Sequence, residues 1–197
     1  ELIHFQTVST IKTEDEINLA GTLNRIDMIF DTVNNSLDKA SHFYNGHCDD
    51  MVTSLRQLAS LSPYSRSFSI VENNVIRCSS LEGNISVAVS EYFKEKQKLS
   101  LSYGPIPSSN TLVINLKRAF QQMDIIASIP GFYFYNDIAG RNSSEQLYLN
   151  INGFHLNSLG QLRAQLPERA GTRTLVQASS RYDYKLTYVL PDSYTLE

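Results

Sequence analysis

Apolar residues between positions 9 and 43 recur at alternating intervals of four and three residues. This spacing is a heptad seam over three repeats, and it predicts one long α-helix. Asn45-Gly46 follows the periodic stretch and ends the helix. A seam this narrow suits either a partner helix in a dimer or the helix's own domain, and both interpretations stay open. The seam consists of Leu19, Leu23, Ile26, Phe30, Val33, Leu37 and Ala40.

A second helix is predicted over residues 48–61. Two acidic residues, Asp49 and Asp50, lie in its first turn, where the helix dipole favours negative charge. Ser62-Pro63 stops it. The apolar stripe that we expect to face the core is Met51, Leu55, Leu58 and Leu61.

A β-hairpin comes next, with strands over 66–72 and 75–81. Asn73-Asn74 between them tolerates the positive φ angles of a tight two-residue turn. In that register Ser69 lies opposite Cys78 and Val71 lies opposite Ile76. Cys78 is therefore predicted to share a sheet face with Val71 and Ile76.

The rest of the chain mixes short strands with one helix, predicted over 117–128 with Phe120, Met123 and Ala127 inward. Alternating apolar and polar residues favour an antiparallel sheet with one solvated face. We predict one α+β domain over 1–197, with a helical arm at 9–43 and a core at 44–190. This layout resembles PAS-like (Cache/PDC-like) extracytoplasmic sensor domains. The predicted strands are 98–103, 111–116, 131–135, 146–151, 173–177 and 182–190.

Composition and charge exclude several classes of protein. The 197 residues are 42% hydrophobic and 19% charged, which is ordinary for a globular protein. The net charge is −3 without a basic stripe, so no nucleic-acid partner is expected. Neither an apolar run of transmembrane length nor a known catalytic, phosphate-binding or metal-ligand motif occurs, so we expect no catalytic residue, cofactor or metal site in this chain. The first residue is Glu1, from which we expect a fragment of a longer protein.

The sharpest local motif is Cys78-Ser79-Ser80 at the end of the predicted hairpin, with a second cysteine, Cys48, upstream. Together with the long helix, the helix after Cys48 and the later strands, it resembles the CSS-motif domain over nearly the whole chain. That domain lies in the bacterial periplasm between two membrane helices. It precedes a cytoplasmic EAL-type cyclic-di-GMP phosphodiesterase.

The resemblance implies that Cys48 and Cys78 form a disulfide that acts as a redox switch. In that family the oxidised pair inhibits the phosphodiesterase. Reduction of the pair relieves the inhibition and exposes the protein to periplasmic proteolysis. The implied partners are the periplasmic disulfide-forming machinery, proteases and, through the seam helix as a transmission element, a second copy in the full-length protein. The fragment itself is not an enzyme, and an EAL domain outside it would use Mg or Mn. The implied location is the periplasmic side of the inner membrane, with anchoring helices outside this chain.

Two other functions stay open. One is a PAS-like small-molecule sensor in which the disulfide is purely structural, and it predicts convergent polar groups in a pocket. The other is a helix-mediated dimerisation domain, which predicts association through the seam.

Overall fold

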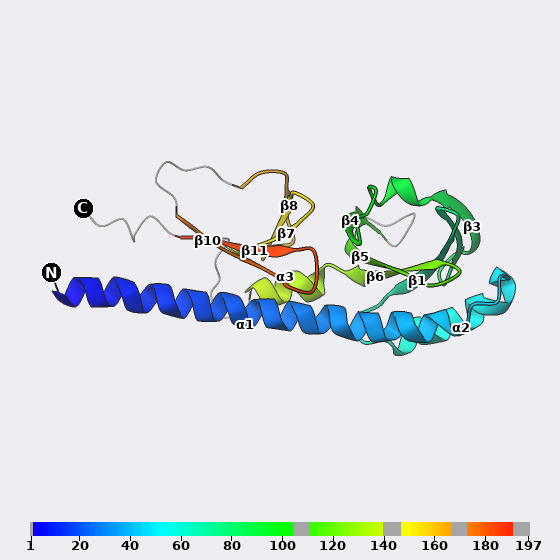
Figure 1. Ribbon diagram of the computed structural model, residues 1–197, viewed down its shortest axis with the longest axis horizontal. Helices are drawn as coiled ribbons and strands as arrows, with labels where there is room; N and C mark the ends of the chain where they lie inside the picture. The colour runs from blue at the N-terminus through cyan, green and yellow to red at the C-terminus, as the bar shows by residue number, and fades with distance from the viewer. Residues whose placement is uncertain (1, 105–110, 140–146, 167–172, 191–197) are drawn as a thin grey trace. The chain divides into compact units, whose positions relative to one another are not determined.

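A computed structural model describes residues 2–104, 111–139, 147–166 and 173–190 (Figure 1). The chain divides into two compact units. Unit 1 comprises residues 1–27 and 134–197, and unit 2 comprises residues 28–133. Helix α1 (Leu2–Ser41) contributes its first part to unit 1 and its last part to unit 2.

Unit 2 contains helix α2 (Cys48–Leu61), a short 3-10 helix η1 (Val89–Glu91) and a six-stranded antiparallel sheet. The strand order is β3-β2-β1-β6-β5-β4. Helix α2 packs against the β1–β3 end of this sheet. The strands are β1 (Ser67–Glu72), β2 (Val75–Ser79), β3 (Gly83–Ala88), β4 (Leu99–Tyr103), β5 (Leu112–Ala119) and β6 (Asp124–Pro130).

Unit 1 contains a second antiparallel sheet, of five strands in the order β10-β11-β7-β8-β9. Helix α3 (Phe132–Ala139) begins at the end of unit 2 and continues into unit 1. The predicted α+β class, with a long N-terminal helix and antiparallel strands, is confirmed, although the strands form two sheets and not one. The strands are β7 (Leu147–Ile151), β8 (Phe154–Asn157), β9 (Leu162–Arg163), β10 (Thr174–Ala178) and β11 (Lys185–Val189).

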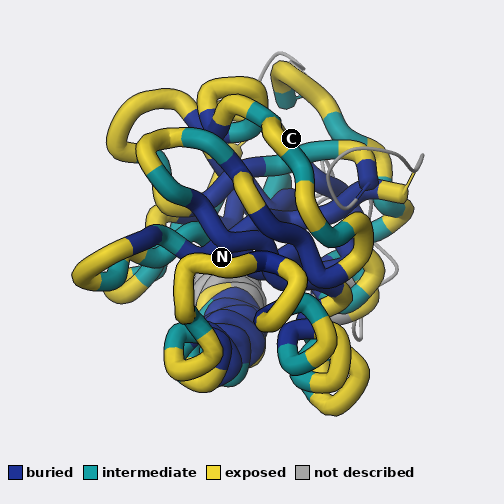
Figure 2. Tube along the Cα trace, turned by 90° about the vertical axis from the view of Figure 1, so that its right-hand side faces the viewer, coloured by how far each residue is buried: buried dark blue, intermediate teal, exposed yellow. Residues whose placement is uncertain are grey.

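The heptad seam of α1 is buried within the chain. Ile26, Phe30 and Leu37 have no exposed surface, and Leu19, Leu23 and Val33 are each at most 8% exposed. In Figure 2 the helix shows this buried stripe in dark blue, whereas the turns that connect the strands are largely yellow. The seam therefore packs on the chain's own core. Among the residues of the helix whose burial is described, the exposed large apolar side chains are Ile17 and Met28, outside the seam.

Helix α2 has the predicted bounds but a narrower buried stripe. Met51 and Leu55 are buried, at 3% and 0% exposed. Leu61, predicted to face the core, is 73% exposed. Leu61 is the last residue of the helix, and the buried residues of α2 are Cys48, Met51 and Leu55 in its first turns.

The hairpin of β1 and β2 forms as predicted, with Asn73 and Asn74 both at positive φ (50° and 62°). Its register differs beyond the turn. Val71 pairs with Ile76 as predicted, but an irregularity between Ile70 and Val71 places Ile70, not Ser69, opposite Cys78. Because one extra residue reverses the alternation of side chains, Cys78 shares a face with Ile70 and not with Val71 and Ile76.

Two predicted elements are wrong. The segment 117–128 is not a helix: it completes β5, turns with a hydrogen bond from the Phe120 N–H to the Met123 carbonyl, and continues as β6. The strand predicted over 131–135 is helix α3, in which Phe134 and Ile138, one turn apart, are 0% and 2% exposed. Gly131, just before it, donates its N–H to the Leu112 carbonyl.

Candidate functional site

A disulfide joins Cys48 to Cys78, with an S–S distance of 2.01 Å and a Cα–Cα distance of 5.3 Å. Cys48 is the first residue of α2, and Cys78 lies near the end of β2. The Cα separation falls in the usual range for disulfides. The pairing implied by the family resemblance is thus present, and it fixes the start of α2 to the sheet.

The two serines of the motif shape the turn between β2 and β3. The Ser79 hydroxyl accepts a hydrogen bond from the Leu81 N–H at 3.2 Å, which closes the turn. Ser80 makes two hydrogen bonds with Phe68, near the start of β1. Its hydroxyl accepts from the Phe68 N–H at 3.0 Å, and its own N–H donates to the Phe68 carbonyl at 2.9 Å. Gly83 leaves the turn at φ 77°, a conformation that favours glycine. Both serines are 1% exposed, so the turn is a fixed support for Cys78.

Two polar contacts join α2 to the same region. The Asn84 amide of β3 donates to Asp49 Oδ1 at 2.6 Å. The Arg56 Nε donates to the Ser80 carbonyl at 2.7 Å. We call these two contacts the α2 latches. Neither involves a sulfur atom, so both can exist when the disulfide is open.

The chemistry available to the cysteine pair is thiol–disulfide exchange. As whole residues, Cys48 is 9% exposed and Cys78 is 1% exposed, so we expect an external thiolate to attack Cys48. The leaving sulfur is then that of Cys78. Groups of three or more His, Cys, Asp or Glu suited to hold a metal ion do not occur among the described residues.

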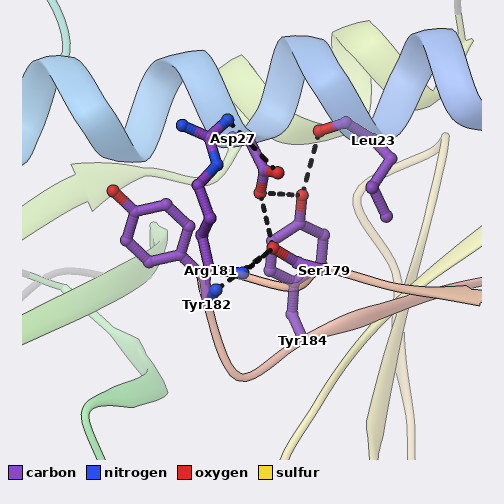
Figure 3. Close-up of polar contacts among 6 residues, drawn as sticks. All are labelled: Leu23, Asp27, Ser179, Arg181, Tyr182 and Tyr184. Carbon is purple, nitrogen blue, oxygen red and sulfur yellow. Dashed lines mark hydrogen bonds and ion pairs between the residues drawn. The ribbon is translucent and has the colours of Figure 1, made fainter.

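A second polar site lies in unit 1, where Asp27 of α1 meets the turn between β10 and β11 (Figure 3). Tyr184 Oη and Ser179 Oγ each donate to Asp27 Oδ1 at 2.8 Å. Arg181 lies 3.4 Å from Asp27 Oδ2. The Ser179 hydroxyl also accepts the N–H groups of Arg181 and Tyr182, both at 3.1 Å. We call this network the Asp27 clamp, because it fixes the hairpin turn to the helix.

The centre of the Asp27 clamp is buried, whereas the Arg181 side chain is 48% exposed. Asp27 is 3% exposed and Tyr184 is 4% exposed. Burial raises the pKa of the Tyr184 phenol well above its ordinary value, and the hydrogen bond to Asp27 and its negative charge add to the effect. The Tyr184 hydroxyl also lies 3.0 Å from the Leu23 carbonyl, so its proton has two acceptors on α1. The folded chain therefore holds the Tyr184 proton more tightly than an exposed tyrosine does.

Sequence reasoning missed the Asp27 clamp and included Tyr184 only within the strand predicted over 182–190. A signal was present: Asp27 follows Ile26 and lies one helical turn after Leu23, beside the apolar seam. An ionisable residue in that position is buried with the seam and needs a partner. The sequence did not indicate which distant residues would supply it.

The sequence profile of the family described as "CSS motif domain associated with EAL" matches residues 14–196. Curated proteins give no match. Among the described residues, no helix is both long and apolar enough to cross a membrane.

Solved structures of sensor domains have a similar fold at low sequence identity. An extracellular ligand binding receptor from Desulfohalobium retbaense is 14% identical with a TM-score of 0.61, and the match covers 89% of this chain and 40% of the receptor. The periplasmic domain of RsbU from Chlamydia trachomatis is 12% identical with a TM-score of 0.61, covering 95% of this chain and 94% of that domain. The sensory domain of the chemoreceptor Tlp3 from Campylobacter jejuni is 7% identical with a TM-score of 0.59, covering 98% and 99%.

These likenesses show the fold alone, that of extracytoplasmic sensor domains. The family is shown by the profile, which spans most of the chain and includes both cysteines and the Cys78-Ser79-Ser80 motif. The chain belongs to the family of CSS-motif domains associated with EAL.

Proposed function

We propose that this chain is the periplasmic redox-sensing domain of a bacterial inner-membrane protein. In this proposal the Cys48–Cys78 bond regulates a cytoplasmic EAL cyclic-di-GMP phosphodiesterase outside the chain. The observation that carries the proposal is the disulfide itself, which links the first turn of α2 to the motif turn of the sheet. Opening this link would release α2 at one end, and α2 follows α1 after a short connection, so the change has a path to the long helix.

The partners in this proposal follow from the chemistry. A periplasmic oxidant of the disulfide-forming machinery would close the bond, and proteases would act on the reduced, loosened form. A homodimer of the full-length protein is also proposed. Because the seam of α1 is buried in the chain, its contacts would come from exposed residues such as Ile17 and Met28. Sedimentation of the full-length protein in detergent tests this, and a single monomeric species would contradict it.

The experiment for the redox proposal uses the full-length protein in membranes. Cyclic-di-GMP hydrolysis is measured with the bond oxidised, with the bond reduced, and in a Cys48→Ser, Cys78→Ser variant. We expect low activity in the oxidised form and higher activity in both others, with no response of the variant to reductant. Equal activity in all three would reject redox control. The isolated chain should produce no linear product from cyclic-di-GMP.

A second candidate function, small-molecule sensing, is favoured by a buried polar row in the sheet of unit 2. Ser100, Asn115 and Ser128 lie opposite one another on β4, β5 and β6, and each is at most 3% exposed. The Asn115 amide donates to Ser100 and to Ser102, at 3.3 and 2.8 Å, and its carbonyl oxygen accepts from Ser128 at 2.8 Å. Burying polar side chains costs free energy, and such side chains are often retained at functional sites, where they bind a ligand. Thermal-shift titrations with small organic acids test this, and no shift with any of them would leave the row structural.

A further inference from the structure

Both α2 latches lie near the cysteine pair and involve residues that follow Cys48 and Cys78 in the chain. Asp49 follows Cys48 in the chain, and Asn84 is the ladder partner of Cys78 on β3. The first latch therefore connects the immediate neighbours of the two sulfur-bearing residues. The second latch, from Arg56 to the Ser80 carbonyl, lies two helical turns further along α2. Helix and turn are thus held at two points besides the disulfide.

The equilibrium between disulfide and dithiol depends on how close the two thiols stay once the bond is open. A thiol held near its partner has a high effective concentration, and this favours the disulfide. Contacts that do not involve sulfur persist in the dithiol form, so they contribute directly to that proximity. Asn84–Asp49 and Arg56–Ser80 are contacts of this kind. Both have a charged donor or acceptor, which makes them stronger than neutral hydrogen bonds.

We propose that Arg56 and Asn84 are positioning residues that set the reduction potential of the Cys48–Cys78 pair. By keeping α2 on the motif turn after reduction, they keep the thiols close and make the bond harder to reduce. The inference rests on the proposed redox function for its biological meaning, but the potential itself is a property of this chain.

An external dithiol such as dithiothreitol supplies the two electrons that reduce the disulfide. Its thiolate attacks the sulfur of Cys48, the more exposed residue, and Cys78 leaves as a thiolate that takes up a proton. The second thiol of the reagent then displaces Cys48 from the mixed disulfide. The chain gains two thiols, and dithiothreitol becomes a cyclic disulfide.

The test compares the wild-type chain with Arg56→Gln, Asn84→Ala and the double variant. Each is equilibrated over a series of reduced-to-oxidised dithiothreitol ratios, and free thiols are trapped with a maleimide that adds mass. We expect the disulfide equilibrium constant to fall about threefold in each single variant and about tenfold in the double variant, a rise in potential of about 30 mV.

The matched control is Arg77→Gln. Arg77 precedes Cys78 and carries the same charge, but its side chain contacts Ser86 within the β2–β3 hairpin, at 3.4 Å, and not α2. A double variant within twofold of wild type, or an equal shift in Arg77→Gln, would overturn the proposal. Circular dichroism checks folding, and if Arg56→Gln does not fold, Asn84→Ala alone decides. If the variants shift the reduction potential but the redox state does not change the phosphodiesterase activity, the role of the α2 latches is supported and only the proposed function is rejected.

Discussion

Reduction of the Cys48–Cys78 bond is expected to lower the free energy of unfolding by roughly 3.5 kcal/mol and to leave both sheets folded. The bond closes a loop with a sequence separation of 30 residues, and the chain-entropy model gives a loss of this size when such a loop opens. The sheet of unit 2 does not depend on the bond, because its strands are joined by their own ladders over a core of buried apolar residues.

Hydrogen exchange with and without reductant locates the effect. We expect faster exchange in residues 44–62 and in the adjoining end of α1, because the disulfide anchors the first turn of α2. The amides of β5 and β6 should stay protected, since these strands form the longest ladder of the sheet.

The control is the Cys48→Ser, Cys78→Ser variant, which should match the reduced wild type and show no response to reductant. Unchanged exchange on reduction would leave a purely structural bond. Loss of protection throughout the sheet would show that unit 2 needs the bond to fold. This result would contradict the expectation that the ladders and the apolar core hold the sheet together without the bond.

The disulfide was predictable from the family resemblance, whereas the sheet face on which Cys78 lies was predicted wrongly. Alternation along the hairpin placed Cys78 on the face of Val71 and Ile76, and the irregularity between Ile70 and Val71 moves it to the other face. A bulge has no firm signal in a single sequence, because one inserted residue changes no composition and no hydrophobic count. The pairing was right because family resemblance, and not register, identified it.

The helix α2 and the Asn73-Asn74 turn were predictable because local chemistry determines both. The segment 117–128 was not, because residues such as Lys117, Ala119 and Met123 favour helices, while pairing with β1 and β4 favours strands. Long-range pairing prevailed over local propensity. The Asp27 clamp joins residues more than 150 positions apart, and nothing local indicates such a partner.

Replacing Asp27 with alanine is expected to lower the free energy of unfolding by about 1.5–3 kcal/mol. The change removes one of the two acceptors of Tyr184, the carboxylate that accepts from Ser179, and the partner of the half-exposed Arg181. Asp27 itself is 3% exposed. Tyr184 keeps the Leu23 carbonyl as an acceptor at 3.0 Å, so the loss comes from hydrogen bonds to a buried charged group and not from a buried donor without a partner. Urea unfolding followed by circular dichroism measures the loss.

The matched control is Asp38→Asn on the same helix. Asp38 pairs with Arg118 at 2.9 Å, but both side chains are exposed, at 49% and 40%. Exposed ion pairs contribute less than about 1 kcal/mol. If Asp27→Ala costs no more than Asp38→Asn, the Asp27 clamp does not stabilise the fold.

The Asp27 clamp also predicts a dependence on alkaline pH. The pKa of Tyr184 is raised in the folded chain above the value of 10.0 for a free phenol, so the folded state keeps a proton that the unfolded state releases. The stabilisation by Tyr184 is therefore complete below about pH 10 and is lost as the pH rises above it. Tyr184→Phe lacks this proton, so the stability difference between wild type and variant should be larger at about pH 8 than at about pH 11.

The pKa values of Tyr44 and Tyr92 are also raised, but both tyrosines are present in both proteins, and their effects cancel in the comparison. A difference that does not change with pH would mean that the hydroxyl of Tyr184 contributes no proton-linked stability.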